Sequence, residues 1–424
     1  MVWTAAQATA KTATAKEGTA DLARPEPAAT AADDRRRAVF ARFPNFWFDV
    51  GGVPYALDDP YVVTGEVVAT VRAAARDAWA VFARVVPIVA ALPDDELVSI
   101  GIPRNALGVC RYACGPSPTF LGRFDFALTT RGPKLLEFNA DTPFFVWESF
   151  EVGGAMAVAN GLTDPNAGAL ETFRRAIARE LRDVERNATV AVIAYNTWRE
   201  DWFTGCFTAR VASEALEREV RTVPISELRV DARGCTDASG RRIDVLWRYY
   251  PIEHFARDPA GDAFFARVQD GSVRVLNPPR ALLSQNKATQ AVIWGLRESD
   301  VFDATTREHV ANIFLPTFLD LPHDGARYVR KPVLGREGNG VAIIEGGAVF
   351  EASPPSGYES QPVVYQQYVD LPSVAFAHRA ESRTFGYAVL SCFVVGGTPC
   401  AVGVRVGGRI TDTRAFMVPL GVQP

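Results

Sequence analysis

The pattern of apolar and polar positions predicts helices and strands along most of the 424 residues. Apolar side chains recur at helical spacing from Thr64 to about Leu92, and a second helix is expected at about 166 to 187. The apolar run ATVAVIAYN and the segment DVLWR each predict a strand. The middle third, about 188 to 275, is therefore expected to alternate strand and helix in the α/β manner.

The C-terminal third begins with a predicted helix and continues with strands. The helix is expected from Lys287 through Trp294, with Ser284 or Asn286 as its cap. RYVRK, at 327 to 331, is typical of a strand that enters the loop PVLGREGNG. The last hundred residues are β-rich runs separated by glycine turns, which predicts a sheet.

The stretch GRFDFALTTRGPKLLEFNAD, residues 122 to 141, is the most informative in the chain. It predicts two strands joined by a turn at TTRGP. Because side chains alternate along a strand, Arg123 and Asp125 share one face, as do Glu137 and Asn139. In a hairpin these groups converge, and Mg²⁺ takes oxygen ligands while arginine binds phosphoryl groups. A magnesium and phosphate site is one interpretation, and an amphipathic hairpin with a solvated polar face is the other.

A glycine-rich loop follows a predicted strand that ends in a cation. Lys331 precedes GREGNG at 335 to 340, and glycine lets backbone N-H groups approach phosphate oxygens. Alone, such a loop is more often merely a tight hairpin. Lys287, at a helix start, would by default be a solvated surface residue. The order of two lysines, the loop and the later YQQYV strand resembles an ATP-grasp nucleotide cleft.

Composition narrows the classes of function. A net charge of -4 and a pI near 5.8 give no reason to expect a nucleic-acid partner. Six cysteines without zinc-site spacing and four scattered histidines favour a reduced, cytoplasmic protein without a structural zinc, and Cys110 and Cys114 are expected to be small buried residues. With no apolar run of membrane length, we expect no membrane span and no secretory signal. Residues 1–38, rich in Ala and Thr, are expected to form a mobile tail.

Several separate motifs in order carry a resemblance to a known family. They are GRFDFAL with KLLEFNADTP, then TWRED, DVLWRYYPIEHF, NPPRALLSQNKA, VRKPVLGREGNGVAI, VVYQQYVDLP and AVGVRV. From about residue 43 the chain resembles the synthetase domain of glutathionylspermidine synthases. The resemblance implies an α/β fold that is ATP-grasp-like with permuted segment order and includes a pre-ATP-grasp-type α/β region. It also implies an N-terminal region with the metal-binding hairpin at 39–187, an acceptor-binding region at 188–275 and nucleotide-binding lobes at 276–424.

The resemblance further implies ATP and Mg²⁺ as cofactors and small-molecule carboxylic acid and amine substrates, joined as an amide through an acyl phosphate. Carried over by position, the resemblance gives Asp125, Glu137 and Asn139 as the magnesium ligands and Arg123 and Arg405 as the arginines at the reacting phosphoryl group. It gives Lys287 and Lys331 as the lysines that bind the ATP phosphates, with Gly335, Arg336 and Gly338 in the loop over those phosphates. The adenine segment is Gln366, Gln367, Tyr368 and Val369, and Glu200 and Asp201 belong to a polar loop that binds the amine.

Two positions depart from the family pattern. Phe144 to Trp147 stand where relatives that use glutathione tend to carry a small hydroxyl residue, which suggests a smaller or more apolar acid. Val406 follows Arg405 where an acidic residue is expected. Two other classes therefore stay open beside the ligase: a nucleotide-binding protein without ligase activity, and a phosphotransferase that stops at the phosphorylated product.

Overall fold

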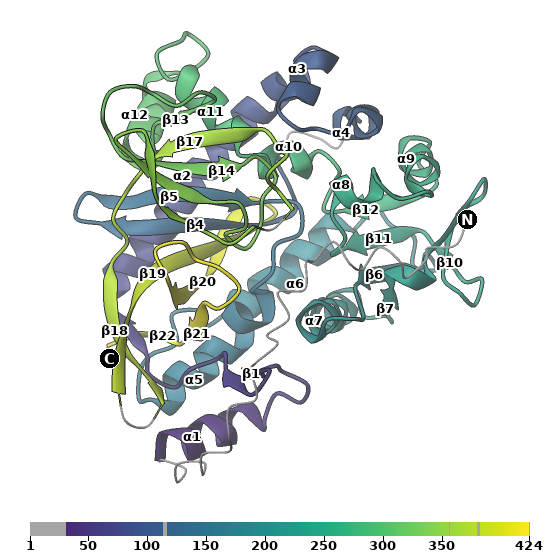
Figure 1. The fold of residues 1–424 in the computed structure, drawn as a ribbon. Coiled ribbons are helices and arrows are strands. Elements are labelled where there is room, and N and C mark those ends of the chain that lie inside the picture. The colour runs from purple at the N-terminus through teal and green to yellow at the C-terminus, as the bar shows by residue number, and fades with distance from the viewer. Residues whose placement is uncertain (1–30, 113–116, 356, 380–381, 424) are drawn as a thin grey trace.

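The computed structural model describes residues 31–112, 117–355, 357–379 and 382–423, and most of its strands form three sheets (Figure 1). The expectations for residues 1–30 and for Cys114 lie outside the described residues. The helices are α1 (Ala31–Phe40), α2 (Gly65–Ala90), α3 (Asp94–Ser99), α4 (Leu107–Arg111), α5 (Gly153–Ala159), α6 (Ala169–Glu180), α7 (Arg199–Leu216), α8 (Ile252–Phe255), α9 (Gly261–Gln269), α10 (Ala281–Gln285), α11 (Ala288–Gly295) and α12 (Ala304–Ile313), with short turns η2 (Arg104–Ala106), η3 (Glu148–Val152) and η4 (Ile225–Glu227).

A large antiparallel sheet contains the predicted hairpin. Its strands are β21 (Phe416–Val418), β20 (Thr398–Gly407), β19 (Ser382–Val395), β4 (Leu121–Thr129) and β5 (Gly132–Asn139) in that order, with β18 (Ser373–Arg379) paired to β19. The hairpin thus joins the last strands of the chain, because β4 pairs with β19 as well as with β5. Segments more than 250 residues apart, such as Asp125 and Ser391, become neighbours in this way.

A second antiparallel sheet and a parallel sheet complete the frame. The antiparallel sheet has the order β13 (Thr317–Phe318), β17 (Val363–Gln367), β14 (Tyr328–Pro332), β15 (Ala342–Glu345) and β16 (Ala348–Ala352). The parallel sheet has the order β12 (Arg274–Leu276), β11 (Val245–Arg248), β6 (Val190–Ala194) and β7 (Arg221–Pro224). Smaller pairings join β1 (Asp49–Val50) to β2 (Val53–Pro54), β3 (Tyr61–Val63) to β22 (Leu420–Val422), and β9 (Gly234–Thr236) to β8 (Arg229–Asp231) and β10 (Arg242–Ile243).

Helix α2 explains which face of the hairpin is polar. Its predicted apolar stripe is confirmed, with Thr64 as the N-cap that accepts from the Val67 N-H, and it packs on β5, β19 and β20. Phe82 of this helix contacts Phe138, whose ring stacks on Phe124 at 3.9 Å between centroids. These rings occupy the apolar face of the hairpin, so the alternate side chains point to the opposite face of the sheet.

The α/β expectation for the middle third is confirmed. Strands β6, β11 and β12 are parallel, and α7, α8 and α9 lie between them in sequence. The helix expected at 166 to 187 is shorter, because α6 covers only Ala169–Glu180. Among the described residues, none of the helices has the length and apolar composition needed to cross a bilayer.

The boundary predicted for the N-terminal tail, residue 38, lies inside a helix. Residues 31–38 belong to α1, and Arg36 is buried there. Its guanidinium donates to the Ala56 carbonyl at 2.5 Å and pairs with Asp49 at 2.5 Å. Composition alone missed this helix because α1 is held by contacts with distant segments rather than by an apolar stripe of its own.

Candidate active site

The hairpin pairs in the register that brings its polar side chains together. Arg123 stands opposite Asn139 and Asp125 opposite Glu137, with a bulge only after Asp125. The Asn139 amide donates to an Asp125 oxygen at 3.1 Å and to a Glu137 oxygen at 3.2 Å. The predicted convergence of the guanidinium, two carboxyls and the amide on one face is therefore present in the fold.

Asp125 is the centre of a buried ionic network. Its side chain is 2% exposed and receives a two-pronged contact from Arg123 at 2.8 Å on each oxygen. Arg405, from β20, donates to the same carboxylate at 2.9 Å, and the Ser391 hydroxyl donates at 2.6 Å. One guanidinium group from the same strand and one from a segment 280 residues away thus meet at one carboxylate, and such groups can also bind a phosphoryl oxygen.

Both predicted lysines reach the same face. Lys287 is the N-cap residue of α11, and its ammonium lies 3.4 Å from Glu137. Lys331 lies on β14 and donates to the Leu136 carbonyl at 3.1 Å, beside Glu137. Although burial opposes ionisation, the two ammonium groups and Arg123 hold the pKa of Glu137 well below its usual range. Burial, only partly offset by Glu137, lowers the pKa of Lys331 to about 8.

The two carboxylates of the hairpin are ligands of the kind that a hard divalent cation takes. Within the described part of the chain no group of three His, Cys, Asp or Glu side chains is arranged to hold a metal. Asp125 and Glu137 supply two carboxylates, and the Asn139 amide nitrogen faces both of them, which leaves its oxygen on the other side of the group. Mg²⁺ is usually held by one or two carboxylates with water and substrate phosphates, so this donor set suits Mg²⁺ better than zinc.

The glycine-rich loop is anchored at both of its ends. The Gly335 carbonyl accepts from the Lys287 ammonium at 2.7 Å, so loop and lysine contact each other as expected. Gly338 has φ +70°, and a Cβ there would lie 2.5 Å from the Thr411 carbonyl oxygen. Only glycine combines this backbone conformation with such a close approach.

Arg336 of this loop turns toward two acids. It forms an ion pair with Glu253 of α8, and its Nη2 lies 3.7 Å from Asp141. Burial opposes ionisation of Glu253, but Arg336 outweighs it and lowers the pKa of this carboxyl to about 2. Asp141 also pairs with Arg248 at 2.6 Å, and both side chains are fully buried. In this conformation the arginine therefore ties the loop to the parallel-sheet region.

The segment that the resemblance assigns to adenine begins in an inner strand, so its first residues offer no free strand edge. Strand β17 lies between β13 and β14, so Gln366 is paired on both sides. The Gln367 N-H donates to Pro316 at 2.7 Å and the Tyr368 N-H to Arg327 at 2.9 Å. The Gln366 side chain points inward and accepts from Lys331 at 2.7 Å. Gln366 therefore supports the lysine, and Val369, beyond the strand end, is the better candidate for a backbone contact to a base.

The acidic segment near 200 is helical, which corrects the expected loop. Glu200 and Asp201 lie in the first turn of α7. Acidic side chains favour this position because they complement the positive end of the helix dipole. Asp201 is buried, while Glu200 lies close enough to Tyr55 and Glu148 to raise the pKa of each. Glu200 thus faces the same part of the fold as Arg123 and Arg405, which also act on this pair.

Sequence reasoning missed one acidic residue of the site. Glu148 opens the π-helical turn η3 and is 3% exposed. Its Oε1 accepts from the Tyr55 hydroxyl at 2.9 Å, and its Oε2 has no hydrogen-bond partner among the described residues. Burial raises the pKa of Glu148 to about 7, and Glu200 adds to the rise. The sequence around it, FFVWESF, gives no signal except a single acid in an aromatic run.

The aromatic run after the hairpin belongs mainly to the core. Phe145, Val146 and Trp147 are all buried, and Trp147 packs against Phe207 of α7. Phe145 has φ +75°, a rare backbone conformation for a bulky residue. The Phe144 carbonyl accepts from Arg123 at 2.6 Å, which fixes the start of this run against the phosphate-side arginine.

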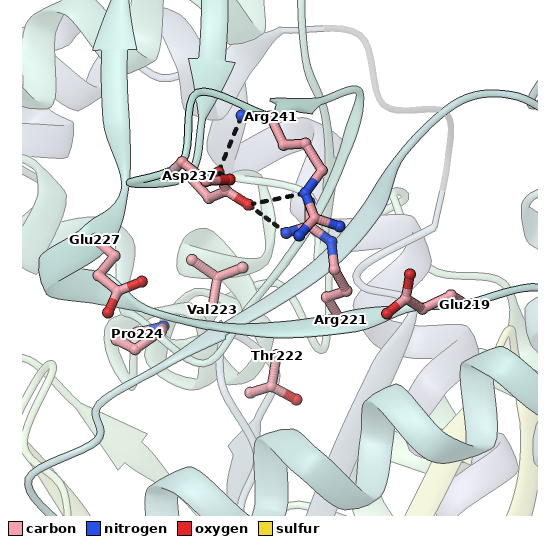
Figure 2. A pocket seen from close by; sticks show the side chains of 9 residues that line it. Glu219, Arg221, Thr222, Val223, Pro224, Glu227, Asp237 and Arg241 are labelled. Carbon is pink, nitrogen blue, oxygen red and sulfur yellow. Dashed lines mark hydrogen bonds and ion pairs between the residues drawn. The ribbon is translucent and has the colours of Figure 1, made fainter.

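A polar pocket of about 460 Å³ lies elsewhere, beside β7 (Figure 2). Arg221 and Arg241 both reach Asp237, which joins the small β8 to β10 sheet to the edge of the parallel sheet. Glu219 and Glu227 also line the pocket, so its charges nearly balance. None of the predicted site residues lines this pocket.

The fold and the polar face together place the chain in the class of ATP-grasp-type folds related to glutathione synthetase. A glutathione synthetase-like effector of Globodera pallida, solved in its apo form, superimposes with a TM-score of 0.54 at 13% identity, covering 86% of this chain and 89% of that structure. At this identity the likeness concerns the fold alone.

The chain belongs to the glutathionylspermidine synthase pre-ATP-grasp family, whose model matches residues 30–423. A Haemophilus influenzae protein provisionally named acid–amine ligase is 25% identical over 301 residues, which are 68% of this chain and 70% of that protein. Trypanothione synthetase of Crithidia fasciculata is 23% identical over 339 residues, 74% of this chain. The match spans only 49% of that synthetase. The family and these relatives indicate a ligase that joins an acid to an amine.

Proposed function

We propose that this protein is an ATP- and Mg²⁺-dependent ligase that joins a carboxylic acid to an amine through an acyl phosphate and releases ADP. The observation that carries the proposal is the single polar face of β4 and β5. Asp125 and Glu137 lie there beside Arg123 of the same hairpin and beside Arg405, Lys287 and Lys331, which come from three other segments. A purely solvated hairpin face has no physical reason to collect four cations, two of them buried, around two carboxylates.

The chain's own residues fit the division of work that such a reaction needs. Bound Mg²⁺ would be held by Asp125, Glu137 and Asn139 and would neutralise phosphate charge. Lys287 and Lys331 would bind phosphate oxygens of ATP, and Arg123 and Arg405 would stabilise charge on the transferred phosphoryl group. The amide then forms without a nucleophilic side chain, so positioning and charge neutralisation supply most of the catalysis.

The acid and the amine are proposed by class only. Glu200 and Glu148 place two carboxyl groups in the region beside Arg123, and their negative charge favours a cationic amine such as a polyamine. Because Phe145, Val146 and Trp147 are buried apolar residues, these three positions offer no polar side chain that could bind a peptide substrate such as glutathione. We therefore propose an acid smaller or more apolar than glutathione.

The test is a condensation screen with purified protein, ATP and Mg²⁺. Pools of acids and amines are offered, ADP release is measured, and products are identified by mass spectrometry. Hydroxylamine in place of the amine is expected to trap the acyl phosphate as a hydroxamate. A stable phosphorylated product that ignores amines would show a phosphotransferase, and ATP binding without any turnover would show a nucleotide-binding protein.

A further inference from the structure

Glu148 differs from the other buried carboxyls of the site because no cation neutralises it directly. Asp125 contacts Arg123 and Arg405, and Glu253 contacts Arg336. The partner of Glu148 is instead the neutral hydroxyl of Tyr55, which leaves Oε2 buried without a hydrogen bond among the described residues. A buried polar atom without a partner is costly, so its retention needs an explanation.

The surroundings of Glu148 place it between the two halves of the proposed reaction. Arg123, from the phosphoryl side, and Glu200, from the proposed amine side, both act on its carboxyl. Arg405 and Glu200 act in the same way on Tyr55, its hydrogen-bond partner. In the proposed reaction the acid therefore stands where an amine coming from the side of α7 would approach the acyl carbon of an acyl phosphate whose phosphoryl group contacts the arginines.

The local backbone holds Glu148 in this position. The residue opens a π-helical turn, an irregularity that is frequent at functional sites. Three residues earlier, Phe145 has φ +75°, and the Arg405 guanidinium lies 5.9 Å from its ring. Glu148 and Ser149 also line a cavity of about 10 Å³, close to the space that one water molecule needs. Strain and irregular backbone persist where the surrounding structure enforces them.

The proposed reaction requires a proton acceptor that the metal and phosphate groups do not supply. An alkylamine has a pKa of about 10.4, so it arrives as an ammonium ion that cannot attack a carbonyl. A carboxylate within hydrogen-bond reach, or one water away, can take this proton, and it works best when its pKa lies near the working pH. Burial gives Glu148 a pKa of about 7.

We propose that Glu148 is the general base of the ligase, oriented by Tyr55, and that it accepts a proton from the ammonium form of the amine substrate. This inference rests on the proposed ligase function. The carboxylate takes one proton and becomes a carboxylic acid, and the amine nitrogen then bonds to the acyl carbon. The bond from that carbon to the phosphate oxygen breaks, and the phosphate leaves with the electron pair and with the second N-H proton.

The decisive experiment compares two nucleophiles in wild type and Glu148→Gln. Putrescine is protonated at neutral pH and needs the base, whereas hydroxylamine is largely neutral and does not. A pool of amino acids, short aliphatic acids and glutathione serves as the acid. In the variant, conjugates with putrescine are expected to fall about a hundredfold or more while hydroxamate formation is retained. Equal loss with both nucleophiles would show a structural role and overturn the inference.

Two further variants sharpen this result. Glu151→Gln is the matched control, because Glu151 lies in the same turn but pairs with Arg210 at 2.6 Å, and neither assay is expected to change. In wild type, kcat is expected to fall as the pH drops through about 7. Tyr55→Phe is expected to move this limb to higher pH, because the Tyr55 hydrogen bond lowers the pKa of Glu148 and its loss therefore raises that pKa. A rise in KM for putrescine with unchanged kcat in Glu148→Gln would show mere ammonium docking and contradict the inference.

A measurement without substrate separates the two proposals. Infrared titration of wild type minus Glu148→Gln is expected to show one carboxyl band that disappears near pH 7. If wild type forms no hydroxamate with any acid, the ligase function fails, whatever this band does. If hydroxamate forms but putrescine conjugation is the same in wild type and Glu148→Gln, the ligase function stands and the role of Glu148 is refuted.

Discussion

Asp125 and Glu148 are both buried carboxyls of one site, yet they have opposite surroundings. Asp125 meets two guanidinium groups and a hydroxyl, while Glu148 meets the hydroxyl of Tyr55 and the nearby carboxyl of Glu200. A carboxylate paired with cations is a fixed negative charge, whereas one buried without them titrates near neutral pH. If the protein is the ligase proposed above, the comparison teaches that the phosphoryl side is organised to hold charge and the amine side to exchange protons.

Asp125→Asn is expected to have the largest effect on the paired side. The variant keeps the volume of the side chain but removes the charge with which the buried Arg123 and the partly exposed Arg405 both pair. Breaking a buried pair in this way costs about 3–5 kcal/mol of stability. Ligase turnover is expected to fall at least a hundredfold, by roughly the loss seen when a preorganised charge-stabilising group is removed. Chemical denaturation and ADP release measure the two effects, and a variant of wild-type stability would show that the network is not neutralised at Asp125.

Glu148→Gln is expected to act in the opposite direction on stability. The folded-state pKa of about 7 lies above the ordinary 4.5, so protonation of this carboxyl stabilises the fold at low pH, and that contribution is lost as the pH rises through 7. Glutamine removes the loss, so the variant is expected to gain up to about 3 kcal/mol relative to wild type at pH 8 and little at pH 4.

Denaturant unfolding of both proteins between pH 4 and pH 9 measures this difference. Glu151→Gln is again the control, because its partner Arg210 lies at the surface and its difference from wild type is expected to be small at every pH. A constant stability difference between Glu148→Gln and wild type across the range would show that Glu148 is ionised throughout, and the contrast with Asp125 would disappear.

The same contrast explains what the sequence could and could not predict. The alternation of Arg123, Asp125, Glu137 and Asn139 depends only on strand geometry, so the two strands and their polar face followed from local residues, whereas the register and the bulge after Asp125 did not. Lys287 and Lys331 required the family resemblance, because nothing local indicates that they approach Glu137. The contacts of such residues arise from packing between sheets.

The errors also have a physical origin in long-range structure. Whether β17 is an edge strand depends on β13, which contains only two residues and leaves almost no pattern in the sequence. TWRED looks like a loop because polar residues follow a buried strand, yet the same residues are suited to the first turn of a helix. Glu148 acquires its properties from Tyr55, which is 93 residues away.

Lys331→Met tests whether the cation-rich side depends on each of its charges. The ammonium is held by the Gln366 side chain and the Leu136 carbonyl and shares Glu137 with Lys287. Its loss is expected to raise KM for ATP about tenfold, one charge-assisted contact of roughly 1.5 kcal/mol, with a smaller change in KM for the amine. Titration with ATP at saturating acid and amine measures this KM. A change in KM for the amine alone would show that Lys331 does not bind the ATP phosphates.

Glu200→Gln is expected to have the smallest effect, and it tests the amine side without touching the base. Glu200 acts on Glu148 and Tyr55 from the first turn of α7, at a distance that leaves Glu148 its own hydrogen bond to Tyr55. Removing its charge weakens the attraction for a cationic amine, so KM for the amine is expected to rise about threefold to tenfold, as for one partly exposed charge.

Because Glu200 also raises the pKa of Glu148, the acidic limb of kcat is expected to shift to lower pH. Both changes must occur together, since one carboxylate attracts the ammonium and repels the charge on Glu148. A change in KM for ATP with no change in the pH profile would separate Glu200 from Glu148 and place the amine elsewhere.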